Sequence, residues 1–197
     1  MAGEDPPLIG VLALQGGFEA HERMLGGLGA RTRQVRVPAD LDGLDGLVIP
    51  GGESTTMTLG IEREGLAAPL RELAHAGTPV LGSCAGLIML DRSHLDLMDM
   101  RAERNAFGRQ VRSFEADVAL RGIDGPPLRG IFIRAPWIAE HGPGVEIIGE
   151  LDGHAVAARQ GALLAVSFHA ELGRDDRLHR LFLEGVRGGA HAPAQPG

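Results

Sequence analysis

A cysteine framed by two glycines constrains the fold most strongly. Residues 82–86 are Gly-Ser-Cys-Ala-Gly, and Cys84 at their centre is the only cysteine. The apolar pair at 80–81 is typical of a buried strand, and the apolar run at 87–90 indicates the start of a helix. A strand that turns directly into a helix crowds the backbone and lifts the central side chain out of the sheet. We therefore expect a nucleophile elbow, with the Cys84 sulfur at a helix N-terminus whose dipole favours the thiolate.

The rest of the chain predicts alternating strands and helices. Strands are expected at 8–14, 31–37, 46–49, 80–82, 110–120, 130–133, 145–151, 154–159 and 162–168, and helices at 17–29, 55–76 (broken near Gly65) and 176–187. This order indicates a single-domain α/β fold with three layers, in which helices cover both faces of a mainly parallel central sheet. We expect the domain to span residues 8–187, with residues 1–7 and 188–197 disordered.

Composition excludes several classes of function. The formal net charge is −7 and no basic run exceeds two residues, which argues against nucleic acid or an anionic membrane as the main partner. A single cysteine allows no internal disulfide and no multi-cysteine metal site, so we expect no metal and no cofactor. The apolar stretches are too short to span a membrane, and the acidic, proline-bearing N-terminus does not resemble a signal peptide. A cytoplasmic location is the resulting expectation.

A second motif lies near the end of the predicted sheet. Residues 165–171 are Ala-Val-Ser-Phe-His-Ala-Glu, an apolar strand that ends in a histidine and a carboxylate. A cysteine nucleophile needs a base that takes its proton, and the base needs an acceptor that fixes its ring. We therefore predict a catalytic triad of Cys84, His169 and Glu171.

A third motif joins a predicted strand to a predicted helix. Residues 50–57 are Pro-Gly-Gly-Glu-Ser-Thr-Thr-Met. The segment is either a glycine turn with a Ser/Thr helix cap or a loop whose backbone N–H groups face a ligand oxygen. In the second interpretation, the N–H groups of Gly52 and Ala85 form an oxyanion hole. The lysine of a phosphate-binding loop is absent. All three motifs follow predicted strands, which is consistent with a single site.

In this order, the three motifs resemble the class I, or triad, glutamine amidotransferases. Further blocks at 10–16, 103–110, 113–115 and 132–136 resemble, more narrowly, the glutaminase subunits of pyridoxal 5′-phosphate synthase, over about residues 8–187. The resemblance implies the flavodoxin-like fold of that class and hydrolysis of L-glutamine to glutamate and ammonia. It also implies a protein partner, a separate synthase subunit that uses the ammonia to make pyridoxal 5′-phosphate (vitamin B6).

The resemblance also implies substrate-binding positions. By this match, Gly52, Glu53 and Ser54 line the glutamine pocket, and Arg104, Ile133 and Arg134 complete it. Cations and N–H donors suit the α-carboxylate of glutamine. Without the resemblance, both arginines would be interpreted as solvated surface charges.

Two departures from the family pattern stand near the site. Ala170 lies between the predicted base and its acceptor, where the family usually has proline, and it keeps their spacing. The segment 91–102 is shorter than in the family. The other histidines show no metal-ligand spacing, and we expect His179 on the exposed face of an amphipathic helix.

Three alternative functions remain open. A glutaminase of another pathway, such as imidazole glycerol phosphate synthesis, would not need the arginine blocks at 103–110 and 132–136. A cysteine peptidase on a similar sheet would lack the Gly-Gly-Glu-Ser segment at 51–54. An inactive regulatory subunit would not need an intact Cys84, His169 and Glu171.

Overall fold

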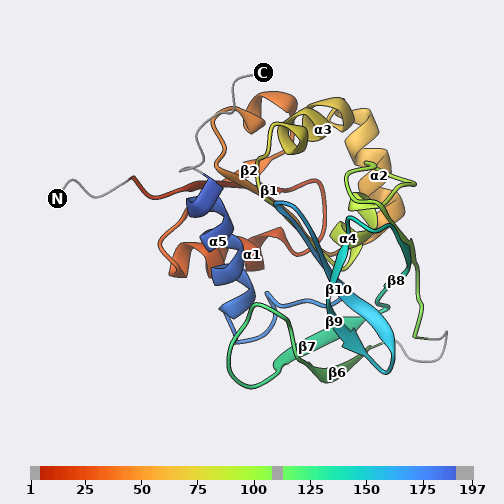
Figure 1. Ribbon diagram of the computed structural model, residues 1–197. Coiled ribbons are helices and arrows are strands. Elements are labelled where there is room, and N and C mark those ends of the chain that lie inside the picture. Colours follow the sequence, from red (N-terminus) through yellow and green to blue (C-terminus); the bar gives the residue numbers. More distant parts are fainter. Residues whose placement is uncertain (1–4, 108–112, 190–197) are drawn as a thin grey trace.

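A long mixed sheet runs through the centre of the molecule (Figure 1). The computed structural model describes residues 5–107 and 113–189. Within these ranges, nine strands pair in the order β2-β1-β3-β4-β11-β10-β8-β5, and β9 pairs with β10 off this path. The strands of this sheet are β1 (Leu8–Leu12), β2 (Arg31–Val35), β3 (Gly46–Ile49), β4 (Val80–Ser83), β5 (Met100–Glu103), β8 (Trp137–His141), β9 (Glu146–Leu151), β10 (His154–Gln160) and β11 (Leu163–Val166).

The five strands from β2 to β11 pair in parallel. Every residue of β3, β4 and β11 is buried, because helices cover both faces of this part of the sheet. The carboxyl ends of all five strands lie along one edge of the sheet, the usual place for a ligand site in this architecture.

Five helices form the two outer layers among the described residues: α1 (Phe18–Gly27), α2 (Ser54–Arg63), α3 (Ala67–His75), α4 (Ala85–Leu90) and α5 (Arg177–Gly189). A short 3-10 helix, η1 (Pro38–Leu41), follows β2. Helices α1 and α5 lie side by side and share one apolar core with the sheet (Figure 1). Helices α2, α3 and α4 share a second core on the opposite face. The expected three-layer α/β fold is confirmed.

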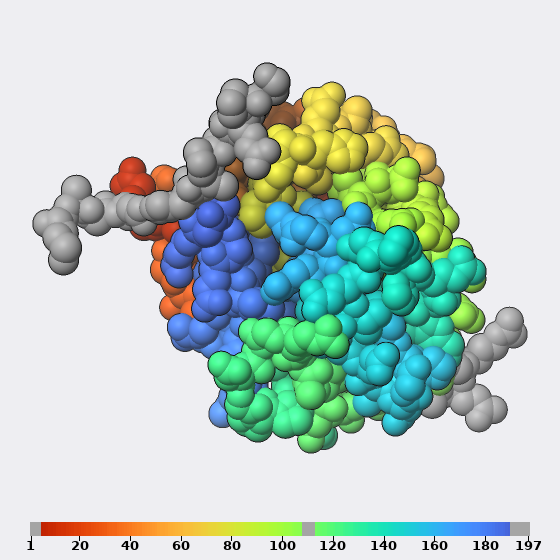
Figure 2. All heavy atoms as spheres, in the orientation of Figure 1, coloured from red at the N-terminus to blue at the C-terminus, as the bar shows by residue number. Residues whose placement is uncertain are grey.

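The antiparallel half of the sheet carries a small appendage. Strands β8, β9 and β11 pair with β10 in antiparallel fashion, and β5 pairs with β8. A separate two-stranded sheet joins β6 (Ser113–Val118) to β7 (Leu128–Ile133). In the space-filling view, the β6–β7 hairpin (green) lies at the bottom of the molecule, and α5 (blue) lies to the left of the strands coloured cyan (Figure 2). An isolated bridge from Ile131 to His169 ties the hairpin to the segment after β11.

The structure differs from the sequence-based expectation at several boundaries. Strands β5 and β8 were not predicted, because both are short and partly charged. Helix α5 continues through Gly189, so residues 188 and 189, which were expected to be disordered, are helical. At the other end, the carbonyls of Pro6 and Pro7 accept hydrogen bonds from Arg31. The strand expected from residue 110 begins at Ser113, and residues 110–112 lie outside the described ranges. Within those ranges, no helix has the length and apolarity to cross a membrane.

Candidate active site

Cys84 occupies the turn between β4 and α4, where the backbone is tightly folded. Its φ of 50° and ψ of −106° are rare for a residue with a side chain, and such strain is typical of functional sites. A Cβ on Gly82 would stand 2.6 Å from the Gly86 carbonyl oxygen, and a Cβ on Gly86 would overlap the Ile49 carbonyl oxygen. The two glycines are therefore required. The sharp strand-to-helix turn predicted at Cys84 is present, and the role of Cys84 as a nucleophile stays a prediction.

His169 and Glu171 lie just beyond the end of β11, beside the elbow. The His169 backbone N–H donates to the Ile131 carbonyl at 2.8 Å, which fixes the segment, and His169 Nδ1 lies 2.6 Å from Glu171 Oε1. Burial lowers the pKa of His169, but hydrogen bonds and charge from Cys84 and Glu171 outweigh burial and raise that pKa to about 10. Burial raises the pKa of Glu171, but the hydrogen bond from His169 and the nearby histidines hold it below its ordinary value. The geometry therefore favours an imidazolium beside a carboxylate.

One cavity of about 300 Å³ gathers the predicted site residues. It is lined by Gly52, Glu53, Ser54, Cys84, Ala85, Arg104, Ile133, Arg134 and His169, together with Ile88, Asn105 and Pro136, which the sequence analysis did not single out. Glu171 lies behind His169, out of the cavity wall, with its side chain fully buried. The volume suits a ligand of amino-acid size. The structure thus brings the three sequence motifs to one place.

The loop before α2 closes one side of this cavity against the imidazole. A Cβ on Gly51 would overlap the His169 ring, so only glycine allows this approach. The Cys84 sulfur lies 3.8 Å from the Ile133 carbonyl oxygen on the other side. Gly52 and Ala85 both line the cavity beside Cys84, and their service as oxyanion donors stays a prediction.

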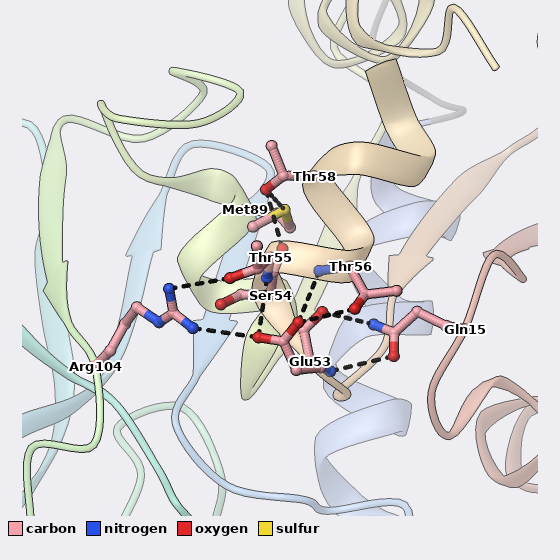
Figure 3. A network of polar contacts seen from close by, with 8 residues as sticks. All are labelled: Gln15, Glu53, Ser54, Thr55, Thr56, Thr58, Met89 and Arg104. Carbon is pink, nitrogen blue, oxygen red and sulfur yellow. Dashed lines mark hydrogen bonds and ion pairs between the residues drawn. The ribbon is translucent and has the colours of Figure 1, made fainter. Parts of the chain in front are cut away.

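Glu53 organises the mouth of the cavity (Figure 3). Its carboxylate caps α2 by accepting hydrogen bonds from the N–H groups of Thr55 at 3.1 Å and Thr56 at 2.7 Å, and these bonds lower its pKa to about 2. Glu53 therefore takes the capping role that the sequence analysis gave to a Ser/Thr residue. The Gln15 amide brackets the Glu53 backbone, with Nε2 donating to the carbonyl at 3.0 Å and Oε1 accepting from the N–H at 3.1 Å.

Two exposed arginines flank the opening. Arg104 contacts Glu53 Oε1 at 3.2 Å and Thr55 Oγ1 at 3.3 Å, so its guanidinium is held over the loop (Figure 3). Arg134 has a φ of 45° and Asn105 a φ of 50°, which places two more strained residues on the cavity wall. This cationic opening beside backbone N–H groups suits a carboxylate-bearing ligand.

Two histidines for which no catalytic role was predicted lie directly behind the predicted triad. His21 on α1 and His179 on α5 are fully buried, and His21 Nδ1 lies 2.9 Å from His179 Nε2. The expectation that His179 lies on the surface is wrong. A signal was present in the sequence: His179 precedes Phe182, Leu183 and Val186 by three, four and seven residues, so it belongs to the buried stripe of the helix.

Both departures from the family pattern are accommodated locally. Ala170 is buried, and its carbonyl accepts a hydrogen bond from the Gly173 N–H at 3.3 Å. Buried Asp91 organises the short 91–102 segment by accepting hydrogen bonds from the N–H groups of Ser93 and Ala102 and by contacting His94 Nδ1 at 2.7 Å. The matching blocks at 103–110 and 132–136 flank the cavity, apart from residues 108–110, which lie outside the described ranges.

Comparisons with known proteins agree with this geometry. The sequence model of the SNO glutamine amidotransferase family matches residues 11–187. The pyridoxal 5'-phosphate synthase subunit PdxT of Clavibacter michiganensis subsp. michiganensis (strain NCPPB 382) is 50% identical over 192 residues, covering 92% of each chain. The PdxT subunit of Thermobifida fusca (strain YX) is 51% identical over 197 residues, covering 93% of this chain and 98% of the relative. A crystal structure of a glutamine amidotransferase matches with a TM-score of 0.85 and 42% identity, covering 91% of this chain and 98% of the other.

Proposed function

The chain belongs to the SNO glutamine amidotransferase family, and from this premise we propose that it is the glutaminase subunit of a pyridoxal 5′-phosphate synthase. It hydrolyses L-glutamine to L-glutamate and ammonia, and a separate synthase subunit consumes the ammonia. The single observation that carries the proposal is the cavity itself. Cys84, His169 and residues 52–54 all line it, together with the exposed Arg104 and Arg134.

In the first half of the reaction, the Cys84 thiolate attacks the side-chain carbonyl carbon of glutamine. A C–S bond forms, and the carbonyl oxygen becomes an oxyanion that the N–H groups of Gly52 and Ala85 stabilise. Protonated His169 then gives its proton to the amide nitrogen. The C–N bond breaks, ammonia leaves, and a γ-glutamyl thioester remains on Cys84.

In the second half, a water molecule takes the place of ammonia. Neutral His169 accepts a proton from this water as its oxygen attacks the thioester carbonyl. The C–S bond breaks, glutamate leaves, and the thiolate and imidazolium are restored. Glu171 keeps its contact with His169 Nδ1 throughout, which orients the ring and stabilises its positive charge.

The remaining lining residues recognise the amino-acid end of the substrate. Arg104 and Arg134 supply positive charge for the α-carboxylate, while the 52–54 backbone and the Ile133 segment hold the side chain. We propose a cytoplasmic location, which is compatible with a free catalytic cysteine. The names of the relatives support the synthase partner.

We expect the synthase subunit to activate the chain. The Gly51–Gly52 peptide can flip, because Gly52 with a φ of 158° pays no Cβ penalty there, and the flip would aim its N–H toward or away from the oxyanion. Loss of one oxyanion donor typically lowers the rate by about 10²–10³-fold. Partner binding would select the active conformer.

The test is ammonia release at saturating glutamine across a titration of the synthase subunit. The wild-type chain should release ammonia at a rate that rises with synthase and saturates. Cys84→Ala should bind glutamine and release none. Equal release by Cys84→Ala would refute the proposed chemistry, and no release by the wild-type chain at any synthase concentration would identify an inactive regulatory subunit.

A further inference from the structure

A chain of buried polar side chains runs from the triad into the protein, away from the cavity. His21 Nε2 lies 3.4 Å from Glu171 Oε2 and 3.0 Å from Ser83 Oγ, and His21 Nδ1 lies 2.9 Å from His179 Nε2. All four side chains are buried. They come from α1, α5, the last residue of β4 and the segment after β11. The two helices that cover one face of the sheet lie side by side (Figure 1), and their histidines meet next to Glu171.

The protonation of the two histidines follows from their surroundings. Burial lowers the pKa of His21. Burial, together with the repulsion that a protonated His21 would exert, lowers the pKa of His179 to about 3. Both rings are therefore neutral at neutral pH, and each carries a single N–H.

The direction of the hydrogen bonds follows from the partners of the two rings. When His179 Nε2–H donates to His21 Nδ1, the His21 Nε2–H is left facing Glu171 and Ser83. The reverse direction would point a His21 lone pair at a carboxylate. It would also leave an N–H at His179 Nδ1, which has no hydrogen-bond partner among the described residues. Buried N–H groups without a partner are rare, so the first direction is favoured.

This direction gives the Glu171 carboxylate a second contact. Oε1 lies 2.6 Å from His169 Nδ1, whereas Oε2 makes no hydrogen bond within the described ranges. His21 Nε2, whose hydrogen bond is with Ser83 Oγ at 3.0 Å, lies 3.4 Å from Oε2 as an electrostatic contact. A carboxylate held at one oxygen can rotate, and a second contact restricts that rotation.

We propose that His21, held in place by His179, is a positioning residue that fixes Glu171 against His169 through the second carboxylate oxygen. The proposal deepens the glutaminase function and rests on it for its kinetic consequence. His21 is not among the residues that line the cavity. Besides His179 it contacts Ser83 and Glu171, and of these two only Glu171 belongs to the predicted triad. The effect of His21 should therefore appear in catalysis and not in substrate binding.

The kinetic test compares three variants in the complex with the synthase subunit. His21→Leu removes the N–H, and His21→Gln returns an N–H near the position of Nε2. Leu178→Ala is the matched control. Leu178 lies on α5 in the apolar core between α1, α5 and the sheet and is as buried as His21, but its side chain carries no polar group. His21→Leu should lower kcat about tenfold with KM for glutamine within about twofold. His21→Gln should recover most of kcat, and Leu178→Ala should lower Tm while keeping kcat.

A second readout does not depend on turnover. The short bond from His169 Nδ1 to Glu171 should give a strongly deshielded proton resonance in the free chain, assigned by its loss in His169→Asn. We expect His21→Leu to shift or weaken this resonance, and His21→Gln and Leu178→Ala to keep it. If His21→Leu does not fold, His179→Leu provides the same test with a smaller loss of kcat.

The outcomes separate the two proposals. An unchanged resonance together with an unchanged kcat in His21→Leu, or in His179→Leu in its place, would overturn the positioning role. An equal loss of kcat in Leu178→Ala would also overturn it, because the effect would then be structural. Wild-type protein that releases no ammonia would instead refute the glutaminase function, and the resonance would still decide the role of His21.

Discussion

His169 and Glu171 share one short contact but have unequal roles in the proposed chemistry. His169 moves a proton in both halves of the reaction, so its removal takes away the acid and the base together. Glu171 contacts Nδ1 at 2.6 Å and is fully buried, and it orients the ring and stabilises the imidazolium without exchanging a proton with the substrate. Their substitutions should therefore differ in effect.

We predict that Glu171→Gln retains more activity than His169→Asn. Loss of the orienting carboxylate in a triad typically lowers kcat by about 10⁴-fold, and loss of the base costs at least as much. Single-turnover ammonia release in the synthase complex measures both. Greater residual activity in His169→Asn would show that the two roles have been assigned the wrong way round.

The buried pair of His21 and His179 should make the protein sensitive to acid. The pKa of His179 falls to about 3 in the folded state against an ordinary 6.5, mainly because of burial and of His21, while Glu171 and Asp176 act in the opposite direction. Between pH 6.5 and about 3 the unfolded chain binds more protons at this residue than the folded chain. The free energy of unfolding therefore decreases as the pH falls below about 6.5.

His179→Leu should make the free energy of unfolding less dependent on pH between about 6.5 and 4.5. One proton corresponds to a slope of at most about 1.4 kcal/mol per pH unit. His169 is protonated in the folded state over this range, because its pKa is about 10, and in the unfolded state it is largely protonated below its ordinary pKa of 6.5. Its remaining contribution near pH 6.5 is present in the wild type and in the variant alike. Urea unfolding at several pH values measures the slope, and an identical slope in the variant and the wild type would contradict the assignment.

At the scale of the element, the turn between β4 and α4 depends most on small residues. A Cβ on Gly86 would overlap the Ile49 carbonyl oxygen of the neighbouring strand, and backbone cannot move aside as a flexible side chain can. Gly185 on α5 provides a contrast, because a Cβ there would meet nothing within 4 Å.

Gly86→Ala should therefore destabilise the protein by about 3 kcal/mol or more, as overpacking in a core does. Gly185→Ala should be neutral or stabilising by up to about 1 kcal/mol, because alanine is the better helix former. Thermal unfolding compares the two variants. Similar Tm values for both would show that the elbow is less crowded than described.

The sequence predicted the parallel strands well and the antiparallel half less well. Strands β3, β4 and β11 are continuous apolar runs, and burial on both faces leaves that pattern in the sequence. Strands β5 and β8 carry Arg101, Glu103 and Glu140 on exposed positions, and their pairing is set by β10 and by each other. The hydrophobic pattern of a short segment does not show which strand it will pair with.

The candidate site divides in the same way. That Cys84, His169 and the 52–54 loop line one cavity was predictable, because Cys84, His169 and the start of that loop each lie within three residues of the end of a strand and carry reactive or glycine-rich chemistry. His21 and His179 were not recognised, since their importance depends on two helices that meet in space and are separated by 158 residues in sequence.

At the scale of the whole molecule, the two halves of the sheet serve different parts of the site. The parallel half ends in the Cys84 elbow, the 52–54 loop and the segment that carries His169. The antiparallel half and the β6–β7 hairpin bring Arg104, Ile133 and Arg134 to the same cavity. The proposed nucleophile thereby follows a buried strand, and the arginines proposed to face the substrate stand on the more exposed side.

The central claim is that Cys84 attacks a glutamine-shaped substrate in this cavity. The most direct measurement is mass spectrometry of the chain after reaction with a glutamine-analogue electrophile, in the presence of the synthase subunit and with free glutamine as competitor. The account predicts one adduct, located on Cys84, slowed by glutamine and absent from Cys84→Ala. An adduct on another residue, or labelling of Cys84 that glutamine does not slow, would contradict it.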